Sequence, residues 1–184
     1  MLIEYYHGQN FWIENGCHSE PVYPFNDQVL KEAEDLLKVK LPRELIQLME
    51  IRNGGSLAYP NFVLPDKGEK DSLPGIYPIH MMNDDPSMLS LREAFHEAAL
   101  PEGIVPLWSD YHNWIVLDYR HTKKDPPVLK VTEDYTDHSW IYTEIAPAFN
   151  KFLKMLLEQI KERRLYNESG EGIPEDWQTS SKSS

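Results

Sequence analysis

The chain has 184 residues, of which 41% are hydrophobic and 11% aromatic, so it is long enough for one domain that needs no metal or disulfide to stabilise its core. A single cysteine, Cys17, excludes an internal disulfide framework and fits a reducing compartment. The formal charge of −12, from 30 acidic and 18 basic residues, argues against direct binding of nucleic acid or an anionic membrane, because both need clustered Lys and Arg.

The amino-terminal residues carry neither the basic stretch nor the apolar segment of a signal peptide, and no run approaches the ~20 apolar residues that cross a bilayer. We therefore expect a cytoplasmic protein with no membrane contact. The negative charge has two readings: it keeps a protein in solution, or it steers a basic partner toward it.

Residues 1–25 hold scattered aromatic side chains among turn formers, which predicts an amino-terminal extension packed on the domain. The first helix is expected from Asn26 or Asp27 to Lys38. Either residue can cap the free amide groups of the first turn, and apolar residues then recur at helical spacing.

A second helix is expected to open at Pro42, where the missing amide costs nothing. It should end at Asn53-Gly54-Gly55, because glycine adopts the left-handed conformation that terminates helices. Its core side is expected to consist of Leu45, Ile46, Leu48 and Met49, and the assignment of Ile51 stays open.

The middle of the chain reads mostly as strands. A strand is predicted over 57–64, interrupted by Pro60, and a short extended piece over 76–79. A helix is expected over 87–100, with Leu91, Ala94, Phe95 and Ala98 on one side.

The clearest strand pair is 104–108 and 114–119, joined by a polar turn. In the second strand Trp114 and Val116 face one way, while Ile115, Leu117 and Tyr119 face the other. Apolar residues on both faces predict a central strand. Another strand is expected over 128–131.

The last predicted element is a helix over 144–164 with a wide apolar stripe that includes Ile145, Phe149 and Phe152. The polar tail, residues 167–184, is expected to be mobile. We thus expect a single α+β domain over 26–166.

Enzyme signatures are missing from the sequence. It has no dinucleotide-binding glycine pattern, no phosphate-binding loop and no nucleophile elbow, and its seven histidines show no pair at metal-ligand spacing. We therefore expect no catalytic residue, no cofactor and no metal.

Three residues invite comparison with an acid–base site: Asp110 and His112 in the turn, and Asp118 on the strand. The structural alternative, which we favour, is an Asp118–Arg120 ion pair beside a polar hairpin. The pair Asp84-Asp85 similarly reads as a turn and helix cap or as functional acids.

Aromatic residues crowd one stretch of the chain together with Asp110, Asp134 and Asp137. Tyr and Trp among charged side chains are typical of protein interfaces. Tyr111 and Tyr135 lie in expected turns and should be the exposed ones; the full aromatic set is Trp108, Tyr111, Trp114, Tyr119, Tyr135, Trp140 and Tyr142.

Three blocks in order resemble the SMI1/KNR4 family, also called the SUKH superfamily. The first runs from the predicted helix through Leu41-Pro42 to Asn53-Gly54-Gly55, as a helix, a Leu-Pro start and an Asn-Gly-Gly stop. The second, Asp110-Tyr-His-Asn-Trp114-Ile-Val-Leu-Asp118-Tyr119-Arg120, looks like the hairpin of bacterial members. The third is the final helix with Phe149 and Phe152.

Two positions depart from the family pattern. Lys38 lies close to where the first helix of the family often ends in glycine. Tyr111 occupies a turn position where bacterial relatives often carry glycine. The second departure leaves the shape of that turn open.

The resemblance implies an α+β domain in which a mixed or mostly antiparallel sheet packs against helices. Bacterial members are similar to immunity proteins that neutralise polymorphic toxins, many of them nucleases. Fungal members look like regulators of cell-wall glucan synthesis and signalling scaffolds. Neither role is catalytic.

The leading hypothesis is an immunity protein that binds a toxin domain with a basic groove. The residues expected to contact it are Asp84, Asp85, Asp110, Tyr111 and His112. The alternatives are a regulatory scaffold for an endogenous protein, a hydrolase that uses His112 with Asp110 or Asp118, and a small-ligand binder. The oligomeric state stays open.

Overall fold

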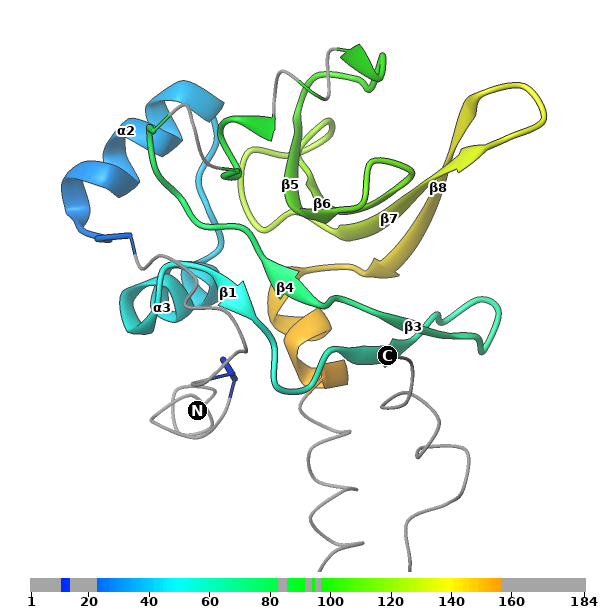
Figure 1. The fold of residues 1–184 in the computed structure, drawn as a ribbon, viewed down its shortest axis with the longest axis horizontal. Helices are drawn as coiled ribbons and strands as arrows, with labels where there is room; N and C mark the ends of the chain where they lie inside the picture. Colours follow the sequence, from blue (N-terminus) through cyan, green and yellow to red (C-terminus); the bar gives the residue numbers. More distant parts are fainter. Residues whose placement is uncertain (1–10, 14–22, 83–85, 92–93, 95–96, 157–184) are drawn as a thin grey trace, which may run out of the picture.

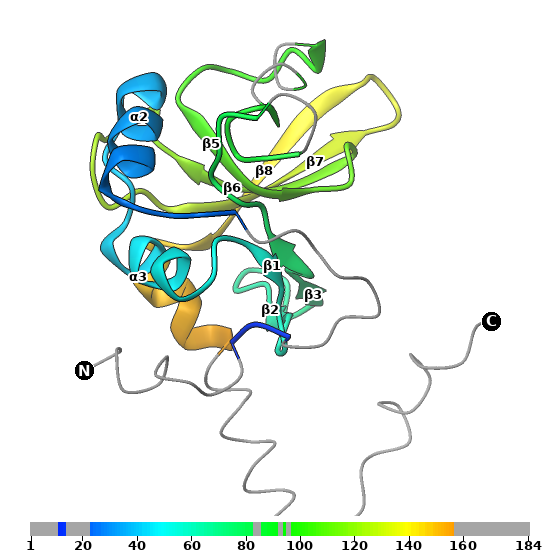
Figure 2. The ribbon, with the colours of Figure 1, turned by 60° about the vertical axis from the view of Figure 1, so that its left-hand side comes forward.

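The computed structural model describes residues 11–13, 23–82, 86–91, 94 and 97–156. It is an α+β fold in which all paired strands are antiparallel. In Figures 1 and 2 two helices lie on one side of the molecule, and a long hairpin of the main sheet projects from the other. The predicted fold class is confirmed.

Helix α2 (Asp27–Leu37) begins where the sequence predicts, because the Asn26 side chain accepts hydrogen bonds from the backbone amides of Gln28 and Val29, both at 3.0 Å. It ends at Lys38, whose φ of 59° is left-handed. Lys38 thus adopts the backbone conformation that glycine favours at a helix end.

Helix α3 (Arg43–Ile51) follows Pro42 and buries Leu45, Leu48 and Met49. Ile51, whose place was open, is 52% exposed and lies off the core side. The predicted glycine stop of this helix is wrong. The helix ends at Arg52, which is extended, so it does not end in a glycine conformation.

Two small antiparallel pairs follow α3. Strand β1 (Gly55–Ser56) pairs with β4 (Gly75–Ile76), and β2 (Asn61–Val63) pairs with β3 (Lys70–Ser72). The single strand predicted over 57–64 is therefore wrong, because the segment containing Pro60 separates β1 from β2. The described amino-terminal residues 11–13 lie along β1, with Trp12 bridged to Leu57.

The main sheet has the order β5–β6–β7–β8, with β5 (Ile104–Ser109), β6 (Asn113–Asp118), β7 (Val128–Asp134) and β8 (Ser139–Ala146). One face packs on the main core through Ile115 and Leu117. The other packs through Trp114 and Val116 on a second cluster that includes Leu91 and Leu100. The prediction that 114–119 is a central strand with two apolar faces is confirmed.

The helix predicted over 144–164 begins too early. Residues 144–146 belong to β8, with Glu144 paired to Leu129 and Ala146 to Val128, and helical backbone starts at residue 149. Ile145 and Ala146 are apolar in either assignment, so hydrophobic periodicity could not separate the strand end from the helix. Residues 157–164 lie outside the described part.

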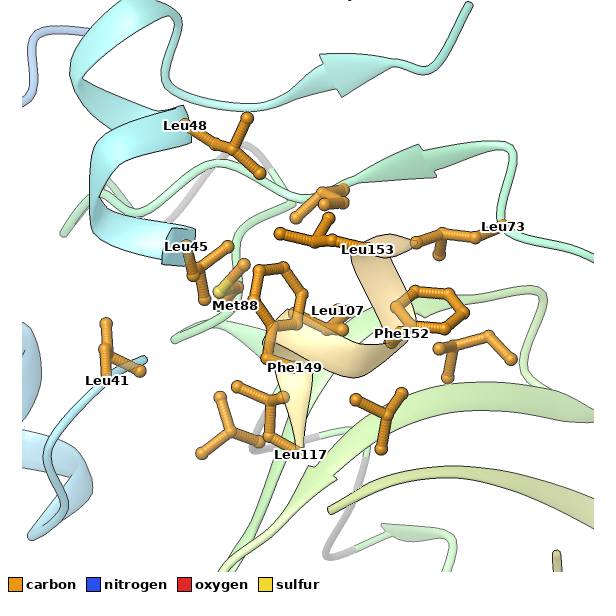
Figure 3. Close-up of a cluster of buried hydrophobic side chains, with 14 of the residues drawn as sticks. Leu41, Leu45, Leu48, Leu73, Met88, Leu107, Leu117, Phe149, Phe152 and Leu153 are labelled. Carbon is orange, nitrogen blue, oxygen red and sulfur yellow. The ribbon is translucent and has the colours of Figure 1, made fainter. Parts of the chain in front are cut away.

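The final helix fills the space between the main sheet and α3 (Figure 3). Phe149, Phe152 and Leu153 point into the core, where Phe152 meets Phe62 edge-on at a ring-centroid distance of 5.3 Å. Leu45 lies across from them on α3. The family-motif residues Leu41, Trp114, Phe149 and Phe152 are all buried core.

The end of β6 nearest the helices is held by three consecutive motif residues. Asp118 accepts two hydrogen bonds from the guanidinium of Arg120, both at 2.9 Å, and this pair outweighs the burial that would raise the carboxyl's pKa, so the pKa of Asp118 is lowered. The Tyr119 hydroxyl donates to the Lys40 carbonyl at 2.7 Å, and burial raises its pKa. The expected structural Asp–Arg pair is confirmed.

No helix within the described ranges is long and apolar enough to cross a membrane.

Candidate functional site

The turn between β5 and β6 is organised by the Asp110 carboxylate. Its Oδ1 accepts the backbone amides of His112 at 3.1 Å and Asn113 at 2.6 Å, and the Asn113 side chain donates to Oδ2 at 3.2 Å. Partial burial opposes ionisation of Asp110, but these hydrogen bonds outweigh it and lower its pKa. The turn therefore carries a fixed negative charge.

Tyr111 sits at the tip of this turn in a left-handed conformation, with φ of 74°. Its amide donates to the Ser109 hydroxyl at 2.7 Å, and its ring meets Trp114 edge-on at 6.3 Å. The side chain is 64% exposed. A bulky residue at positive φ is uncommon, and this backbone conformation costs free energy. Tyrosine is therefore an unusual residue at this position.

The turn between β7 and β8 lies directly beside the first turn. The Glu133 amide donates to the His112 carbonyl at 3.0 Å. The Glu133 carboxylate then joins two imidazoles, with its oxygens 2.8 Å from His112 Nδ1 and 2.7 Å from His138 Nδ1. Tyr135 is 67% exposed, and its ring centroid lies 5.6 Å from that of His112. The predicted exposure of Tyr111 and Tyr135 is confirmed.

The bridge between the two turns changes the pKa of Glu133 and of His138. The hydrogen bonds from His138 and then His112 lower the pKa of Glu133. The same hydrogen bond, together with the charge of Glu133, raises the pKa of His138. Glu133 thus stays ionised while it ties the two turns together.

We call residues 110–112 and 133–138 the hairpin-tip surface. It contains no Lys or Arg; its carboxylates are Asp110, Glu133, Asp134 and Asp137. Two exposed tyrosines stand among these acids. Exposed aromatic rings among an excess of carboxylates suit a partner with basic residues.

The structure brings together three of the five expected contact residues, namely Asp110, Tyr111 and His112. Asp84 and Asp85 lie outside the described residues. The partner of His112 across the turns, Glu133, and the second imidazole bonded to Glu133, that of His138, were not expected. The aromatic-rich stretch that includes Tyr135 was the only sequence signal for them.

The geometry does not form the acid–base pairs considered above. The Asp110 carboxylate accepts a hydrogen bond from the backbone amide of His112, while the His112 imidazole is bonded to Glu133. Asp118 pairs with Arg120 at the far end of β6, about 20 Å along the strand from His112 at ~3.3 Å per residue. Over the described part of the chain, no group of three or more His, Cys, Asp or Glu side chains is placed to hold a metal ion.

A pocket of about 360 Å³ lies next to the first turn, and sequence reasoning did not find it. It is lined by residues 53–56 and 74–78 together with Tyr23, Pro86 and Trp108. Tyr77 connects the pocket to the turn, because its hydroxyl donates to the Ser109 carbonyl at 3.0 Å.

The Asn53-Gly54-Gly55 motif builds one wall of this pocket. The Asn53 side chain is buried, donates to the Ile79 carbonyl and accepts the Ile79 amide, both at 2.8 Å, as a strand partner would. A Cβ at Gly54 would lie 2.6 Å from the Pro78 nitrogen. The motif was expected to end a helix. In the structure it also holds the backbone of Pro78 and Ile79 in place, and we call this set of contacts the clamp.

A family model described as SMI1 / KNR4 family (SUKH-1) matches residues 24–155, more than two thirds of the chain. The match spans the Leu41-Pro42 start, the Asn53-Gly54-Gly55 motif, the 110–120 block and Phe152. The resemblance stated from the sequence is thereby confirmed. No curated protein and no solved structure matches the chain.

Proposed function

We propose that this chain, which belongs to the SMI1/KNR4 family (SUKH-1), is a non-catalytic protein-binding domain that works as an immunity protein. Its partner is a toxin domain with a basic groove, and it neutralises that toxin by covering the active site or the substrate groove. The contact region is the hairpin-tip surface, with Asp84 and Asp85 as further proposed contacts.

The observation that carries the proposal is Tyr111. Its ring is mostly exposed and its backbone is in the left-handed region, where glycine is favoured. Strain kept at an exposed position supports a role outside folding. Tyrosine is enriched among the residues that dominate binding energy, because one ring buries much area at a low entropy cost.

Charge supports the same partner class. A groove that holds nucleic acid is lined with Lys and Arg, which the phosphates neutralise. The carboxylates of the hairpin-tip surface present the same sign of charge as a phosphate backbone. Asp110 is pinned by hydrogen bonds from its own turn, so it meets the partner without losing conformational freedom.

Mechanistically, charge speeds the encounter and the aromatic rings set the residence time. The acids occupy the sites that substrate phosphates would take, while Tyr111 and Tyr135 fill recesses of the groove. The Glu133 bridge supports this role because it holds the two turns in one arrangement before binding. Substrate is then excluded without any reaction by the domain.

The proposal is tested by capturing partners of the tagged protein from its own source cells at low and high salt, and identifying them by mass spectrometry. One toxin domain, lost at high salt, is the expected result. That domain should kill a host cell when expressed alone and spare it when this chain is co-expressed. Recovery of endogenous regulatory proteins only, with the toxin present, would favour the scaffold function.

Matched variants locate the surface. Asp110→Asn keeps the acceptor that organises the turn and removes the charge, so it should fold normally and bind the toxin more weakly. Asp66→Asn removes the same charge from the exposed turn between β2 and β3 and is the control. Equal losses for both variants would show a general charge effect and contradict a contact at Asp110.

A further inference from the structure

We infer that the pocket beside the Asn53-Gly54-Gly55 motif receives an aromatic side chain of the partner, flanked in the partner by basic residues that meet the hairpin-tip surface. The flanking contacts rest on the proposed function. The preference of the pocket for an aromatic ring stands on the pocket itself and is measured without the partner.

The lining disfavours a charged occupant. Its described members include no Asp, Glu, Lys, Arg or His. The buried side chain of Asn53 donates to the Ile79 carbonyl and accepts the Ile79 amide. A charged group placed here would lose water without gaining an oppositely charged partner, whereas an apolar ring gains from burial.

Rings dominate the walls, and the space fits another ring. Tyr23, Tyr77 and Trp108 line the pocket together with three prolines. A cavity of ~150 Å³ lined by apolar side chains is enough to hold benzene, so about 360 Å³ accommodates a tryptophan or tyrosine side chain. Aromatic occupants are further favoured by edge-to-face contacts with such walls.

The walls are formed before any ligand arrives. A Cβ at Gly75 would lie 2.9 Å from the Gly55 carbonyl oxygen, so the β1–β4 backbones are in tight contact. The Tyr23 ring packs on His80 at a centroid distance of 3.9 Å. The His80 Nδ1 accepts the Met82 amide, which orients that imidazole in turn. A preformed pocket avoids an ordering cost on binding.

The position of the pocket selects basic flanks. Trp108 and Tyr77 line it, and the Tyr77 hydroxyl is bonded to Ser109, the residue before Asp110. A residue next to an inserted ring would therefore lie close to Asp110, the first carboxylate of the hairpin-tip surface. Lys or Arg at that place would be attracted, and Asp or Glu would be repelled.

The test uses three capped tripeptides as probes of the whole, ¹⁵N-labelled chain: acetyl-Lys-Trp-Lys-amide, acetyl-Lys-Ala-Lys-amide and acetyl-Glu-Trp-Glu-amide. The Lys-Trp-Lys probe should shift the amide signals of Gly54, Gly55 and Gly75 and the indole signal of Trp108, and these shifts should saturate. The Lys-Ala-Lys probe should leave all four signals in place. The Glu-Trp-Glu probe should move the same signals with a weaker dissociation constant.

Two variants test whether the probe binds against the Tyr23 wall of the pocket. Tyr23→Ala should weaken the affinity for the Lys-Trp-Lys probe roughly fivefold, the loss expected for one aromatic contact. Tyr23→Phe keeps the ring and should bind like wild type. The inference is overturned if the glycine and indole signals do not move, or if Lys-Ala-Lys moves them equally.

Failure of this inference and failure of the proposed function give different results. If a toxin domain is captured and its affinity is the same for Tyr23→Ala and Tyr23→Phe, the immunity function stands and the pocket has no part in it. If the tripeptide binds as expected but no toxin is captured, the pocket stands and the partner belongs to another class.

Discussion

Replacing Tyr111 with glycine should leave the domain about as stable as wild type, although it deletes a large aromatic side chain. The reason is the left-handed backbone at this position, with φ of 74°. The ring itself contributes little to folding because it is 64% exposed and has one ring contact, the edge of Trp114 at 6.3 Å.

The magnitude follows from three opposing effects. Relief of the left-handed strain gains ~1–2 kcal/mol. The greater freedom of glycine in the unfolded chain costs ~0.5–1 kcal/mol, and loss of an exposed ring contact costs ~0.5 kcal/mol. Tyr111→Gly should therefore lie between ~0.5 kcal/mol less and ~1 kcal/mol more stable than wild type. The Tm of Tyr111→Gly should therefore lie between ~2 °C below and ~4 °C above that of wild type.

Thermal and urea unfolding, followed by tryptophan fluorescence, measure this difference. Tyr111→Ala is the matched comparison, because it deletes the same ring and keeps the strain, and it should be ~1 kcal/mol less stable than Tyr111→Gly. A glycine variant that loses ~2 kcal/mol or more would refute the reasoning. That result would mean that the Tyr111 ring stabilises the turn, and its exposure would no longer support a role in binding.

Three further predictions concern the clamp, the core and the bridge. Asn53→Ala should lose ~2–4 kcal/mol of unfolding free energy, because it leaves the amide and carbonyl of Ile79 buried without their partner. Phe152→Ala, at a fully buried site, should lose ~3–5 kcal/mol in urea unfolding. The His138–Glu133 pair is charged above the lowered pKa of Glu133 and below the raised pKa of His138, so its stabilisation should fade as pH rises through the latter. An NMR titration should give His138 a pKa above 6.5 that falls toward 6.5 in Glu133→Gln.

The prediction for Asn53 has a matched control. Asn61→Ala makes the same deletion at an exposed position and should change stability by less than ~0.5 kcal/mol. The clamp does not hold the pocket wall if Asn53→Ala loses as little stability as Asn61→Ala. The same conclusion follows if the Ile79 amide is as protected from hydrogen exchange in Asn53→Ala as in wild type. An unchanged His138 pKa in Glu133→Gln would contradict the bridge between the turns.

Local chemistry made some elements predictable. Asn26 caps α2 because its short side chain reaches the first amides, and that property belongs to the residue itself. Strand β6 was predictable because its two faces carry separate apolar sets, Trp114 with Val116 and Ile115 with Leu117. The cap depends on residues two and three positions along the chain, and the strand depends on a regular alternation of apolar side chains. Both can be recognised in the sequence alone.

Features set by tertiary contact were not predictable. The segment 144–146 could extend either a strand or a helix, and its pairing with β7 decided the outcome. Glu133 lies 21 residues from His112, so nothing local links them. The pocket joins Tyr23, the Asn53 motif and Trp108, which are distant in sequence and meet only in the fold.

The central claim is tested most directly by titrating the captured toxin domain against wild type, Tyr111→Gly and Asp66→Asn in an isothermal calorimeter. Tyr111→Gly should bind roughly tenfold more weakly or worse, the loss typical of a tyrosine anchor, while its Tm stays near that of wild type. Asp66→Asn should bind like wild type. A glycine variant with unchanged affinity would contradict the account, since the exposed, strained tyrosine would then have no part in binding.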